Sequence, residues 1–545
     1  MQMSIPIEKT KCDLYAQLMN PNEWRETRGP SAQPGSNPNE GSTLPCIRRY
    51  ARSVTLLLYT EHDPANPLHQ WRTSMTLPLN KTKIVCTIGP ASCSRDVMEK
   101  LLLAGMNVAR LNFSHGDFSG HKEVIEDLRA AARATGRRLA IMADLPGPKM
   151  RIGKFDSEPI DLKPGDLFTL TTDDVVGDAH RVSVTFTRLP QVVAPGDTLY
   201  LNDGLLQVDV EQVQGSDVIC RVIVGGELRS RKGLNLPGID LGIGAFTEHD
   251  HICMKFALEN GVDAVSQSFV ENAADIQAVR DAAATLGYHP FVIAKIERSR
   301  ALHYLDDIIT AADAVMIARG DLGVELPIEQ IPVVQKQIMR KANMRAKPVI
   351  TATQMLESMT SNRRPTRAEA TDVANAILDG TDCIMLSGES AMGIYPVDAA
   401  AMLAKIAAAI EPYRTMVSAR DLFKGIDLKG KVSRARLIDL SVETVLEHAD
   451  PAAVFVPTHG GNTARSIARL RLPVWIIAVS SQETTCQQLQ FSSGVDPVYK
   501  VEHPENWNTY VSDWLKNHGM EGKLAVVTEG PSRRYPDTNN RLEIL

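Results

Sequence analysis

Short apolar runs that end in polar or charged residues recur along most of the chain. Such runs are typical of buried strands of a parallel sheet, and helical patterns separate most of them. Eight runs fit this description, each with a polar residue at its C-terminal end. The expected strands cover residues 83–88, 108–111, 139–143, 264–267, 291–296, 314–318, 348–352 and 383–386.

Eight strands that alternate with helices predict an α/β fold, the (β/α)8 TIM barrel. Its active site is expected where the C-terminal ends of the strands meet. One helix is expected to begin after an N-cap at Ser94 and to stop before Gly105, and others are expected over residues 273–286 and 366–378.

The alternation of strands and helices stops between Asp144 and Asp263. Pro-Gly and Asn-Asp-Gly turn signals separate short alternating segments there, which predicts a small β-barrel domain inserted after barrel strand 3. Such a domain can act as a lid over the site. Its expected strands cover residues 182–186, 198–201, 207–213 and 218–224.

A further α/β pattern follows the Ala-rich helix expected over residues 397–410 and a basic linker at 424–436. Apolar runs at 453–456, 474–479 and 524–528 predict a C-terminal domain built on a twisted sheet. At the other end, residues 1–74 have little apolar content over 21–45 and predict a disordered extension. The expected domains are the barrel (75–145 and 232–413), the inserted lid (146–231) and the C-terminal α/β domain (414–545).

Composition narrows the class of protein. A chain of 545 residues is too long for one core, and its formal charge of −6 gives no reason to expect nucleic acid as a partner. No apolar run approaches the ~20 residues needed to cross a membrane. The eight cysteines lack C-x-x-C spacing, which favours reduced thiols and a cytoplasmic location.

Charged residues gather at the ends of two adjacent expected strands. Lys295 and Glu297 are two residues apart, so both project from one face of the strand. Asp321 follows the next strand in a Gly-Asp-Leu-Gly segment. Two carboxylates with few other protein ligands suit Mg²⁺, which keeps several waters and takes further oxygens from a phosphorylated substrate. An ordinary salt bridge among the three side chains is the alternative.

The two glycines of that segment are expected to shape its backbone. Gly320 and Gly323 are expected to let the chain turn sharply before a helix that begins near Pro327. The exposed N–H groups of such a turn can bind a carboxylate or a phosphate.

Seven stretches in this order resemble the pyruvate kinase family over roughly residues 78–545. The resemblance implies phosphoryl transfer from phosphoenolpyruvate to ADP, which gives ATP and the enolate of pyruvate. The stretches are KTKIVCTIGPAS (81–92), NVARLNFSHG (107–116), KGLNLPG (232–238), Lys295 to Glu297, ARGDLGVELP (318–327), TATQMLESM (351–359) and MLSGE (385–389).

The resemblance also implies roles for residues at the strand ends. Lys295 and Arg110 would stabilise the charge of the transferred phosphoryl group, while Glu297 and Asp321 would bind Mg²⁺ or Mn²⁺. The backbone of Gly320 and Asp321, with the Thr353 hydroxyl, would bind the substrate carboxylate. Because a Thr hydroxyl is a poor acid, Thr353 would join a water relay, together with Ser387.

The nucleotide is implied to bind on the side that faces the lid. The residues implied for ADP or ATP are Arg110, Asn112, His115, Arg151, Asp203 and Lys232. The family's monovalent-cation site maps to Asn112, Ser114, Asp144, Leu145 and Lys149. For Asn112, Ser114 and His115, a helix cap is the alternative.

Lys149 stands where many family members have Glu. An ammonium there can supply the positive charge of a monovalent cation, so we expect no requirement for K⁺. A surface lysine in a Pro-rich hinge is the alternative.

The C-terminal domain carries one further motif. Thr458, His459, Gly460, Gly461, Asn462 and Thr463 follow an expected strand and open a helix with Arg465 and Arg469. Backbone N–H groups and hydroxyls in such a loop can bind a phosphate, and the resemblance implies a sugar-phosphate or nucleotide effector there. A plain Gly-rich turn is the alternative. The loop at 530–540 departs from the Gly- and Thr-rich pattern of members that respond to fructose bisphosphate.

Two other functions compete with this interpretation. One is another Mg²⁺-dependent barrel enzyme that forms an enolate, such as a phosphoenolpyruvate mutase or an aldol-type lyase, which would not need the lid or the nucleotide residues. The other is an inactive metabolite sensor, against which the presence of Lys295, Glu297, Asp321 and Thr353 counts. The resemblance further suggests a homotetramer.

Overall fold

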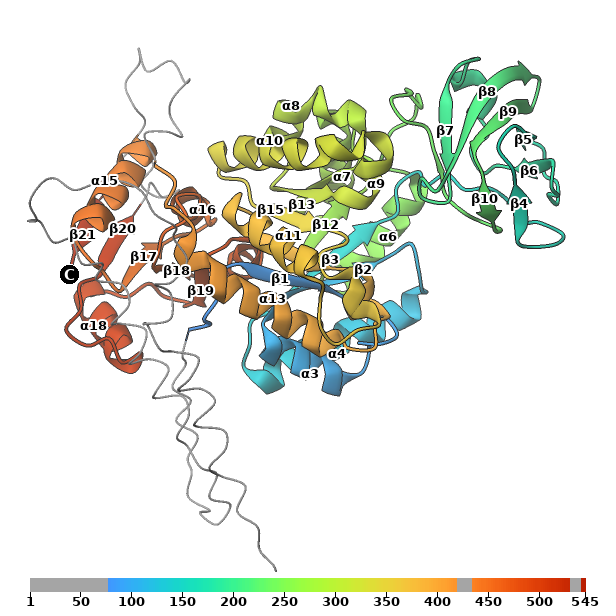
Figure 1. Ribbon diagram of the computed structural model, residues 1–545. Coiled ribbons are helices and arrows are strands. Elements are labelled where there is room, and N and C mark those ends of the chain that lie inside the picture. Colours follow the sequence, from blue (N-terminus) through green and yellow to red (C-terminus); the bar gives the residue numbers. More distant parts are fainter. Residues whose placement is uncertain (1–76, 419–433, 530–540) are drawn as a thin grey trace, which may run out of the picture. The chain divides into compact units, whose positions relative to one another are not determined.

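Eight parallel strands close into a barrel in the computed structural model, which describes residues 77–418, 434–529 and 541–545 (Figure 1). The barrel confirms the predicted fold class. Around the ring the order is β1-β16-β15-β14-β13-β12-β3-β2. The strands are β1 (Lys83–Thr87), β2 (Met106–Asn112), β3 (Ala140–Leu145), β12 (Ala264–Gln267), β13 (Phe291–Ile296), β14 (Ala314–Ala318), β15 (Val349–Ala352) and β16 (Cys383–Leu386).

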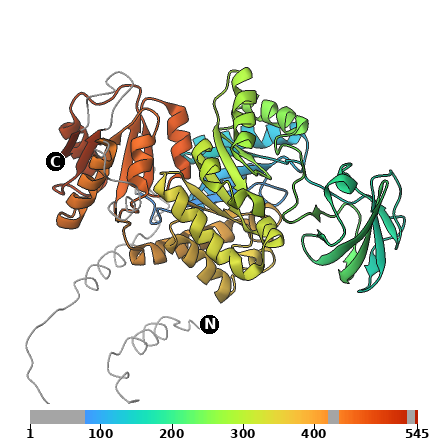
Figure 2. The same ribbon diagram turned by 90° about the horizontal axis from the view of Figure 1, so that it is seen from above.

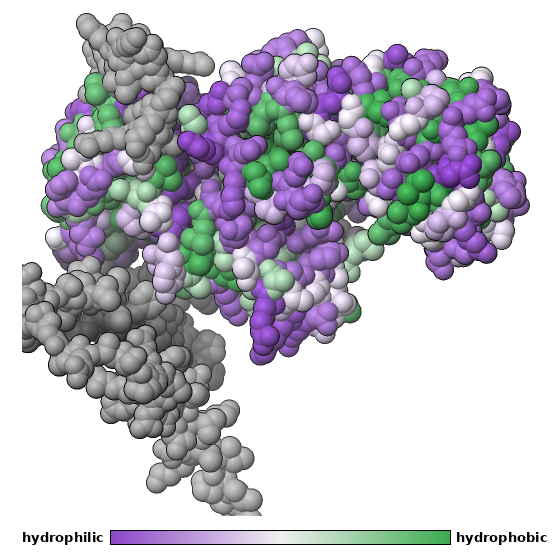
Figure 3. Space-filling view, turned by 45° about the horizontal axis from the view of Figure 1, so that its top comes forward, coloured by the Kyte–Doolittle hydropathy of each residue, from purple (hydrophilic) through white to green (hydrophobic). Residues whose placement is uncertain are grey.

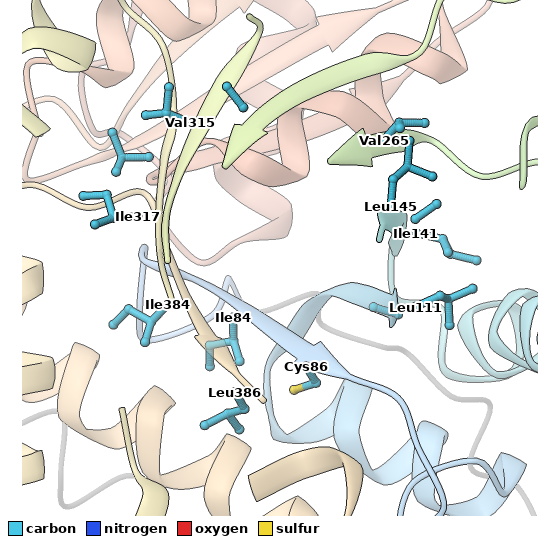
Figure 4. Close-up of a cluster of buried hydrophobic side chains, with 14 of the residues drawn as sticks. Ile84, Cys86, Leu111, Ile141, Leu145, Val265, Val315, Ile317, Ile384 and Leu386 are labelled. Carbon is cyan, nitrogen blue, oxygen red and sulfur yellow. The ribbon is translucent and has the colours of Figure 1, made fainter. Parts of the chain in front are cut away.

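Side chains of the barrel strands alternate between two buried clusters. On β13, Val292 and Ala294 face the surrounding helices, whereas Phe291 and Ile293 face the barrel interior. Figure 4 shows part of the outward cluster, with Ile84, Leu111, Val315 and Leu386 among its labelled members. The same alternation places Lys295 on the inward side, at the end of the strand.

The helices between the strands cover the outside of the barrel. Gly105 ends the first of them in the left-handed conformation (φ 117°), as predicted, whereas the Ser94 side chain makes no capping hydrogen bond. Thr366 forms a full capping box with Glu369. These helices are α3 (Arg95–Ala104), α4 (Phe118–Thr135), α6 (Glu248–Glu259), α7 (Ala273–Thr285), α8 (Leu305–Ala311), α10 (Ile331–Met344), α11 (Arg367–Leu378) and α13 (Pro396–Ile410).

The Gly-Asp-Leu-Gly segment is helical, which corrects the expected sharp turn. Helix α9 (Arg319–Glu325) begins directly after β14, and neither Gly320 nor Gly323 adopts a positive φ. A short 3-10 turn (Ile328–Gln330) then leads into α10. In the first turn of this helix the Gly320 N–H donates to the Thr353 hydroxyl (2.8 Å), a partner that the local sequence could not indicate.

The segment between β3 and α6 forms its own sheets. One has six strands in the order β11-β7-β8-β9-β5-β6, and the other pairs β10 with β4. The larger sheet extends past residue 231, the expected end of the inserted domain, because β11 pairs with β7. The strands are β4 (Ile160–Leu162), β5 (Leu167–Thr171), β6 (Arg181–Ser183), β7 (Thr198–Leu201), β8 (Leu206–Gln214), β9 (Asp217–Val224), β10 (Gly226–Leu228) and β11 (Leu234–Asn235).

A five-stranded sheet in the order β19-β18-β17-β20-β21 organises the C-terminal segment (Figures 1 and 2). Helices α15 (Arg434–His448) and α16 (Asn462–Ala468) pack on one face, and α18 (Trp507–Asn517) packs on the other. The strands are β17 (Ala453–Pro457), β18 (Trp475–Ser480), β19 (Val495–Tyr499), β20 (Val526–Glu529) and β21 (Arg541–Ile544). The expected extension at 1–74, most of the basic linker and the loop at 530–540 lie outside the described residues.

The described surface is mainly hydrophilic in the view of Figure 3, where hydrophobic side chains form scattered patches. Met392 and Ile394 are examples of large apolar side chains that are mostly exposed. Over the described residues, none of the helices combines the length and the apolar character that a membrane span requires.

Buried contacts join the C-terminal segment to the bottom of the barrel. Phe491 stacks on Phe291 inside the barrel, with ring centroids 5.2 Å apart. Arg471 forms a two-pronged ion pair with Asp382, at 2.6 and 2.8 Å. Asp382 immediately precedes β16, so this pair ties the C-terminal segment to a barrel strand.

We predict that Arg471→Met destabilises the protein by about 3–5 kcal/mol, because it leaves the Asp382 carboxylate buried without its cation. Chemical unfolding measures the change. Arg95→Met is the control, since it removes an exposed ion pair with Glu99 and should cost less than about 1 kcal/mol. Equal effects of the two substitutions would contradict the role of the buried pair.

Candidate functional site

A buried cluster of charges occupies the C-terminal end of the barrel. The Lys295 ammonium lies 2.8 Å from Glu297 and 3.3 Å from Asp144. It also donates to the Ser268 hydroxyl at 2.6 Å. These residues come from β13 and from the ends of β3 and β12, so closure of the barrel brings together groups that are distant in sequence.

Arg110 supplies a second cation to the cluster. It lies on β2 and donates to the Asp144 carboxylate through Nε (2.8 Å) and Nη2 (2.5 Å), while Nη1 reaches the Thr87 hydroxyl at 2.9 Å. Asp144 therefore sits between two cations and also accepts from Ser266 (2.7 Å). This arrangement holds both cations in fixed positions.

Mutual attraction keeps these groups charged despite their burial. Burial alone would lower the pKa of Lys295, but Asp144 and Glu297 raise it above its ordinary value. Burial alone would raise the pKa of Asp144, but Lys295 and Arg110 bring it below its usual range. The ammonium and the carboxylate are thus both ionised at neutral pH.

Glu297 and Asp321 have the chemistry of a magnesium site. Burial raises the pKa of Glu297, and the nearby charge of Asp321 raises it further, although Lys295 opposes both effects. A divalent cation would relieve this repulsion, and two carboxylates are the protein ligands that Mg²⁺ commonly uses. Within the described part of the chain, no group of three or more His, Cys, Asp or Glu side chains could hold a metal ion, so water or substrate would have to complete the coordination.

Thr353 lies in a tight turn at the end of β15. Thr353 and Gln354 both have positive φ values, 69° and 53°, which are uncommon for residues with side chains. Arg319 holds this turn, since its Nη2 donates to the Thr353 carbonyl (2.9 Å) and pairs with Asp372 at 2.7 Å. The Thr353 hydroxyl accepts from the Gly320 N–H, which places it beside α9.

Ser387 follows β16 and is partly buried. Its backbone N–H donates to the Glu389 carboxylate at 2.7 Å. The second oxygen of that carboxylate accepts from the Leu356 N–H (3.0 Å), so Glu389 links the loops after β15 and β16.

Arg110, Lys149 and Arg151 form a basic region around His115. Burial lowers the pKa of His115, and the charges of Arg151, Lys149 and Arg110 lower it further. Lys149 is exposed, and the neighbouring Leu145 is buried. The Asn112 side chain accepts from the Ser114 N–H at 3.2 Å. The helix-cap alternative is wrong, because helix α4 begins at Phe118 and its N-cap is Asp117, whose side chain accepts from the Gly120 N–H.

Asp203 and Lys232 belong to the inserted segment. Asn202, Asp203 and Gly204 all have positive φ (53°, 55° and 87°) and form a turn between β7 and β8. A Cβ placed on Gly204 would lie 3.2 Å from the Val324 side chain of α9, so this turn approaches the helix that carries Asp321. The Lys232 carbonyl accepts from the Ile152 N–H at 2.9 Å, and Arg151 donates to the Arg231 carbonyl at 2.9 Å.

Two hydrogen bonds stabilise the loop at 458–463, one within the loop and one from Thr485. Its Thr458 hydroxyl accepts from the Gly461 N–H (3.0 Å), and the His459 carbonyl accepts from the Thr485 hydroxyl at 2.7 Å. Arg469 is buried and pairs with Asp439 at 2.6 Å, away from the loop. Asn462 opens α16, as predicted.

Sequence reasoning missed several partners of the site residues. Ser268 and Thr87 orient the two cations, and Arg319 holds the Thr353 turn. Both hydroxyls stand at the ends of expected strands, a position that could have identified them. The partners of Arg319 lie 34 and 53 residues further along the chain, so no local signal could have identified that contact.

Two family models match the chain: "Pyruvate kinase, barrel domain" over residues 79–400 and "Pyruvate kinase, alpha/beta domain" over residues 437–545. A pyruvate kinase of Thermococcus litoralis is 49% identical over 460 residues, which cover 84% of this chain and 96% of that protein. One of Mycobacterium tuberculosis is 42% identical over 452 residues (82% and 94%). The crystal structure of a pyruvate kinase from Cryptosporidium parvum has a TM-score of 0.79 at 34% identity and covers 86% of this chain and 96% of that one.

We predict that Glu297→Gln weakens Mn²⁺ binding at least about tenfold, because it removes the charge of one of the two carboxylates. Titration of the protein with Mn²⁺, followed by electron paramagnetic resonance, measures the affinity. Glu271→Gln is the control, since that carboxylate pairs with Arg298 and Arg300. Unchanged Mn²⁺ binding in Glu297→Gln would exclude Glu297 as a ligand.

Proposed function

Because the chain belongs to the pyruvate kinase family, we propose that it transfers the phosphoryl group of phosphoenolpyruvate to ADP, giving ATP and pyruvate. The observation that carries this proposal is the buried cluster in which Lys295 and Arg110 are fixed around Asp144 at the C-terminal ends of the barrel strands. A barrel of this kind places its active site at that end.

Fixed positive charge is the main requirement of phosphoryl transfer. The negative charge of the moving group spreads over its oxygens, and preorganised cations stabilise it without reorganising during the reaction. Lys295 and Arg110 meet this requirement because their partners hold them in place. When bound between Glu297 and Asp321, Mg²⁺ or Mn²⁺ would supply further positive charge to the same oxygens.

The substrate carboxylate is proposed to bind at the start of α9. There the N–H groups of Gly320 and Asp321 and the Thr353 hydroxyl would donate to it. Without substrate the Gly320 N–H donates to Thr353, so a bound carboxylate would replace that hydroxyl as acceptor. Thr353 could then rotate toward the substrate and, with Ser387, relay a proton from water to the enolate carbon.

The nucleotide is proposed to lie between the basic region around His115 and the inserted domain. Asn112, Arg151, Asp203 and Lys232 would contribute together with Arg110. The approach of Gly204 to Val324 supports closure of this domain over the site. A closed lid excludes water, which strengthens the electrostatic interactions and prevents loss of the phosphoryl group to hydrolysis.

Three further proposals follow from membership of the family. The loop at 458–463 is proposed to bind a sugar-phosphate or nucleotide effector, with its backbone supported by the Thr458–Gly461 hydrogen bond. A homotetramer and a cytoplasmic location are proposed as well.

A coupled assay tests the activity. We expect pyruvate and ATP to form from phosphoenolpyruvate only when ADP and Mg²⁺ are both present. Lys295→Met should lower the rate more than about a hundredfold, because it removes preorganised charge at the reacting phosphoryl group. Lys100→Met, an exposed change on α3, is the control. Conversion of phosphoenolpyruvate without ADP would instead favour an enolate-forming mutase or lyase.

We further predict that the enzyme needs no K⁺. The Lys149 ammonium is close enough to His115 to contribute to the lowering of its pKa, so it lies beside the nucleotide region. Wild type should be fully active with Mg²⁺ in a tetramethylammonium buffer. Lys149→Glu should react at least about tenfold faster with K⁺ than without it.

The matched control for Lys149→Glu is Lys154→Glu, which makes the same change in charge at another exposed position. K⁺ is titrated into all three proteins, and initial rates are measured. If wild type is nearly inactive until K⁺ is added, Lys149 does not take the place of K⁺. The proposed kinase activity would not be affected by that result.

A further inference from the structure

His121 lies on the first turn of α4, beside the loop at 112–117 that joins β2 to this helix. Its ring is partly buried and stacks on Phe113, with the ring centroids 4.4 Å apart and the planes inclined by 18°. Its Nε2 atom lies 2.9 Å from the carbonyl oxygen of His115. The loop carries three of the residues proposed for the nucleotide or the monovalent cation, whereas His121 itself has no assigned role.

The middle of this loop is exposed and has few contacts that could hold it in place. Ser114, His115 and Gly116 are all exposed. The N–H groups of Ser114 and His115 donate to Asn112, within the loop, at 3.2 and 3.1 Å. Over the described residues, the contact from His121 is the one hydrogen bond that joins these three residues to an element outside the loop.

The two ends of the loop are fixed by other contacts. Phe113 is buried, and its N–H donates to the Asp144 carbonyl of β3 at 3.1 Å. Asp117 caps α4, since its carboxylate accepts from the Gly120 N–H at 2.8 Å. His121 therefore supplies the restraint on the middle of the loop that these end contacts do not provide.

The His121 ring is the hydrogen-bond donor in this contact. A carbonyl oxygen can only accept, so Nε2 carries the proton. Burial lowers the pKa of His121, although the bond to the His115 carbonyl and the charge of Asp117 oppose this effect. The ring is therefore neutral at neutral pH and adds no charge to the basic region around His115.

Gly116 allows the ring to come this close. Its φ of 79° lies in the left-handed region, which favours glycine. A Cβ at this position would lie 3.3 Å from the Nε2 atom of His121, so a side chain there would press on the ring. The loop and the histidine thus fit each other sterically as well as through the hydrogen bond.

We propose that His121 is a positioning residue that fixes the loop at 112–117 for nucleotide binding. It acts through Ser114 and His115 and does not touch the nucleotide. Groups that are held in place before binding lose less conformational freedom when the ligand binds, so the affinity for ADP depends on this restraint. The inference rests on the proposed nucleotide site. The residues proposed for the substrate carboxylate follow β14 and β15 instead, so the effect is specific to ADP.

Three substitutions in the full-length protein separate the hydrogen bond from the ring stack. His121→Gln keeps a donor, His121→Phe keeps a ring, and His121→Ala removes both. We expect His121→Ala and His121→Phe to raise the KM for ADP at least about fivefold, with kcat and the KM for phosphoenolpyruvate within about twofold of wild type. His121→Gln should stay within about twofold of wild type in all three constants.

His518→Ala is the matched control. The His518 ring stacks on Trp514 (3.8 Å between centroids), and its Nδ1 atom lies 2.7 Å from the Trp514 carbonyl oxygen. It follows α18 in the C-terminal segment. This variant therefore loses the same two kinds of contact as His121→Ala but leaves the loop intact, and its KM for ADP should not change.

Hydrogen exchange of the backbone amides at 113–117 measures the restraint without any turnover. We expect exchange at least about tenfold faster in His121→Ala than in wild type, and unchanged in His518→Ala. If wild type forms no ATP, the proposed function is wrong, and hydrogen exchange would still decide whether His121 holds the loop.

Several results would overturn the inference and leave the proposed kinase activity standing. In the kinetic assay these are an unchanged KM for ADP in His121→Ala, an equal rise in His518→Ala, or an equal rise in the KM for phosphoenolpyruvate. A normal KM for ADP in His121→Phe would assign the effect to packing, and a His121→Gln as impaired as His121→Ala would exclude the donor. Unchanged exchange at 113–117 in His121→Ala would also overturn it.

Discussion

The ionic contacts of Lys295 with Asp144 and Glu297 are the interaction on which the site depends. Each of these groups would be costly to bury alone, and each is tolerable because the others are charged. Closure of the eight-stranded barrel makes this possible, since it brings the ends of β3 and β13 to one place. The fold therefore holds fixed charges in a largely water-excluded position, which is the property that phosphoryl transfer requires.

The inner face of β13 carries Lys295 at its C-terminal end and apolar core residues below it. Phe291 and Ile293 fill the barrel interior beneath Lys295, and Phe491 of the C-terminal segment closes the bottom by stacking on Phe291. One short strand therefore joins Phe291 at the bottom of the barrel to Lys295 at the top.

Thr353 has an unfavourable backbone conformation that contacts from Arg319 stabilise. Its left-handed backbone would be unfavourable in isolation, and Arg319 holds it through a carbonyl hydrogen bond and an ion pair with Asp372. The Thr353 hydroxyl accepts from the Gly320 N–H, which joins the turn to the start of α9. These contacts hold the turn in one conformation.

The sequence by itself determined the barrel strands and the residues at their ends. β12, β13, β14 and β16 begin and end where the apolar runs predicted, because a buried strand needs an apolar run and a polar residue can follow only where the strand leaves the core. Tertiary structure decided what depends on partners distant in sequence. Examples are the helix at Arg319–Glu325 in place of a turn and the orientation of Lys295 by Ser268. Hydrogen bonds between remote segments leave no local pattern, so they become visible only after the chain has folded.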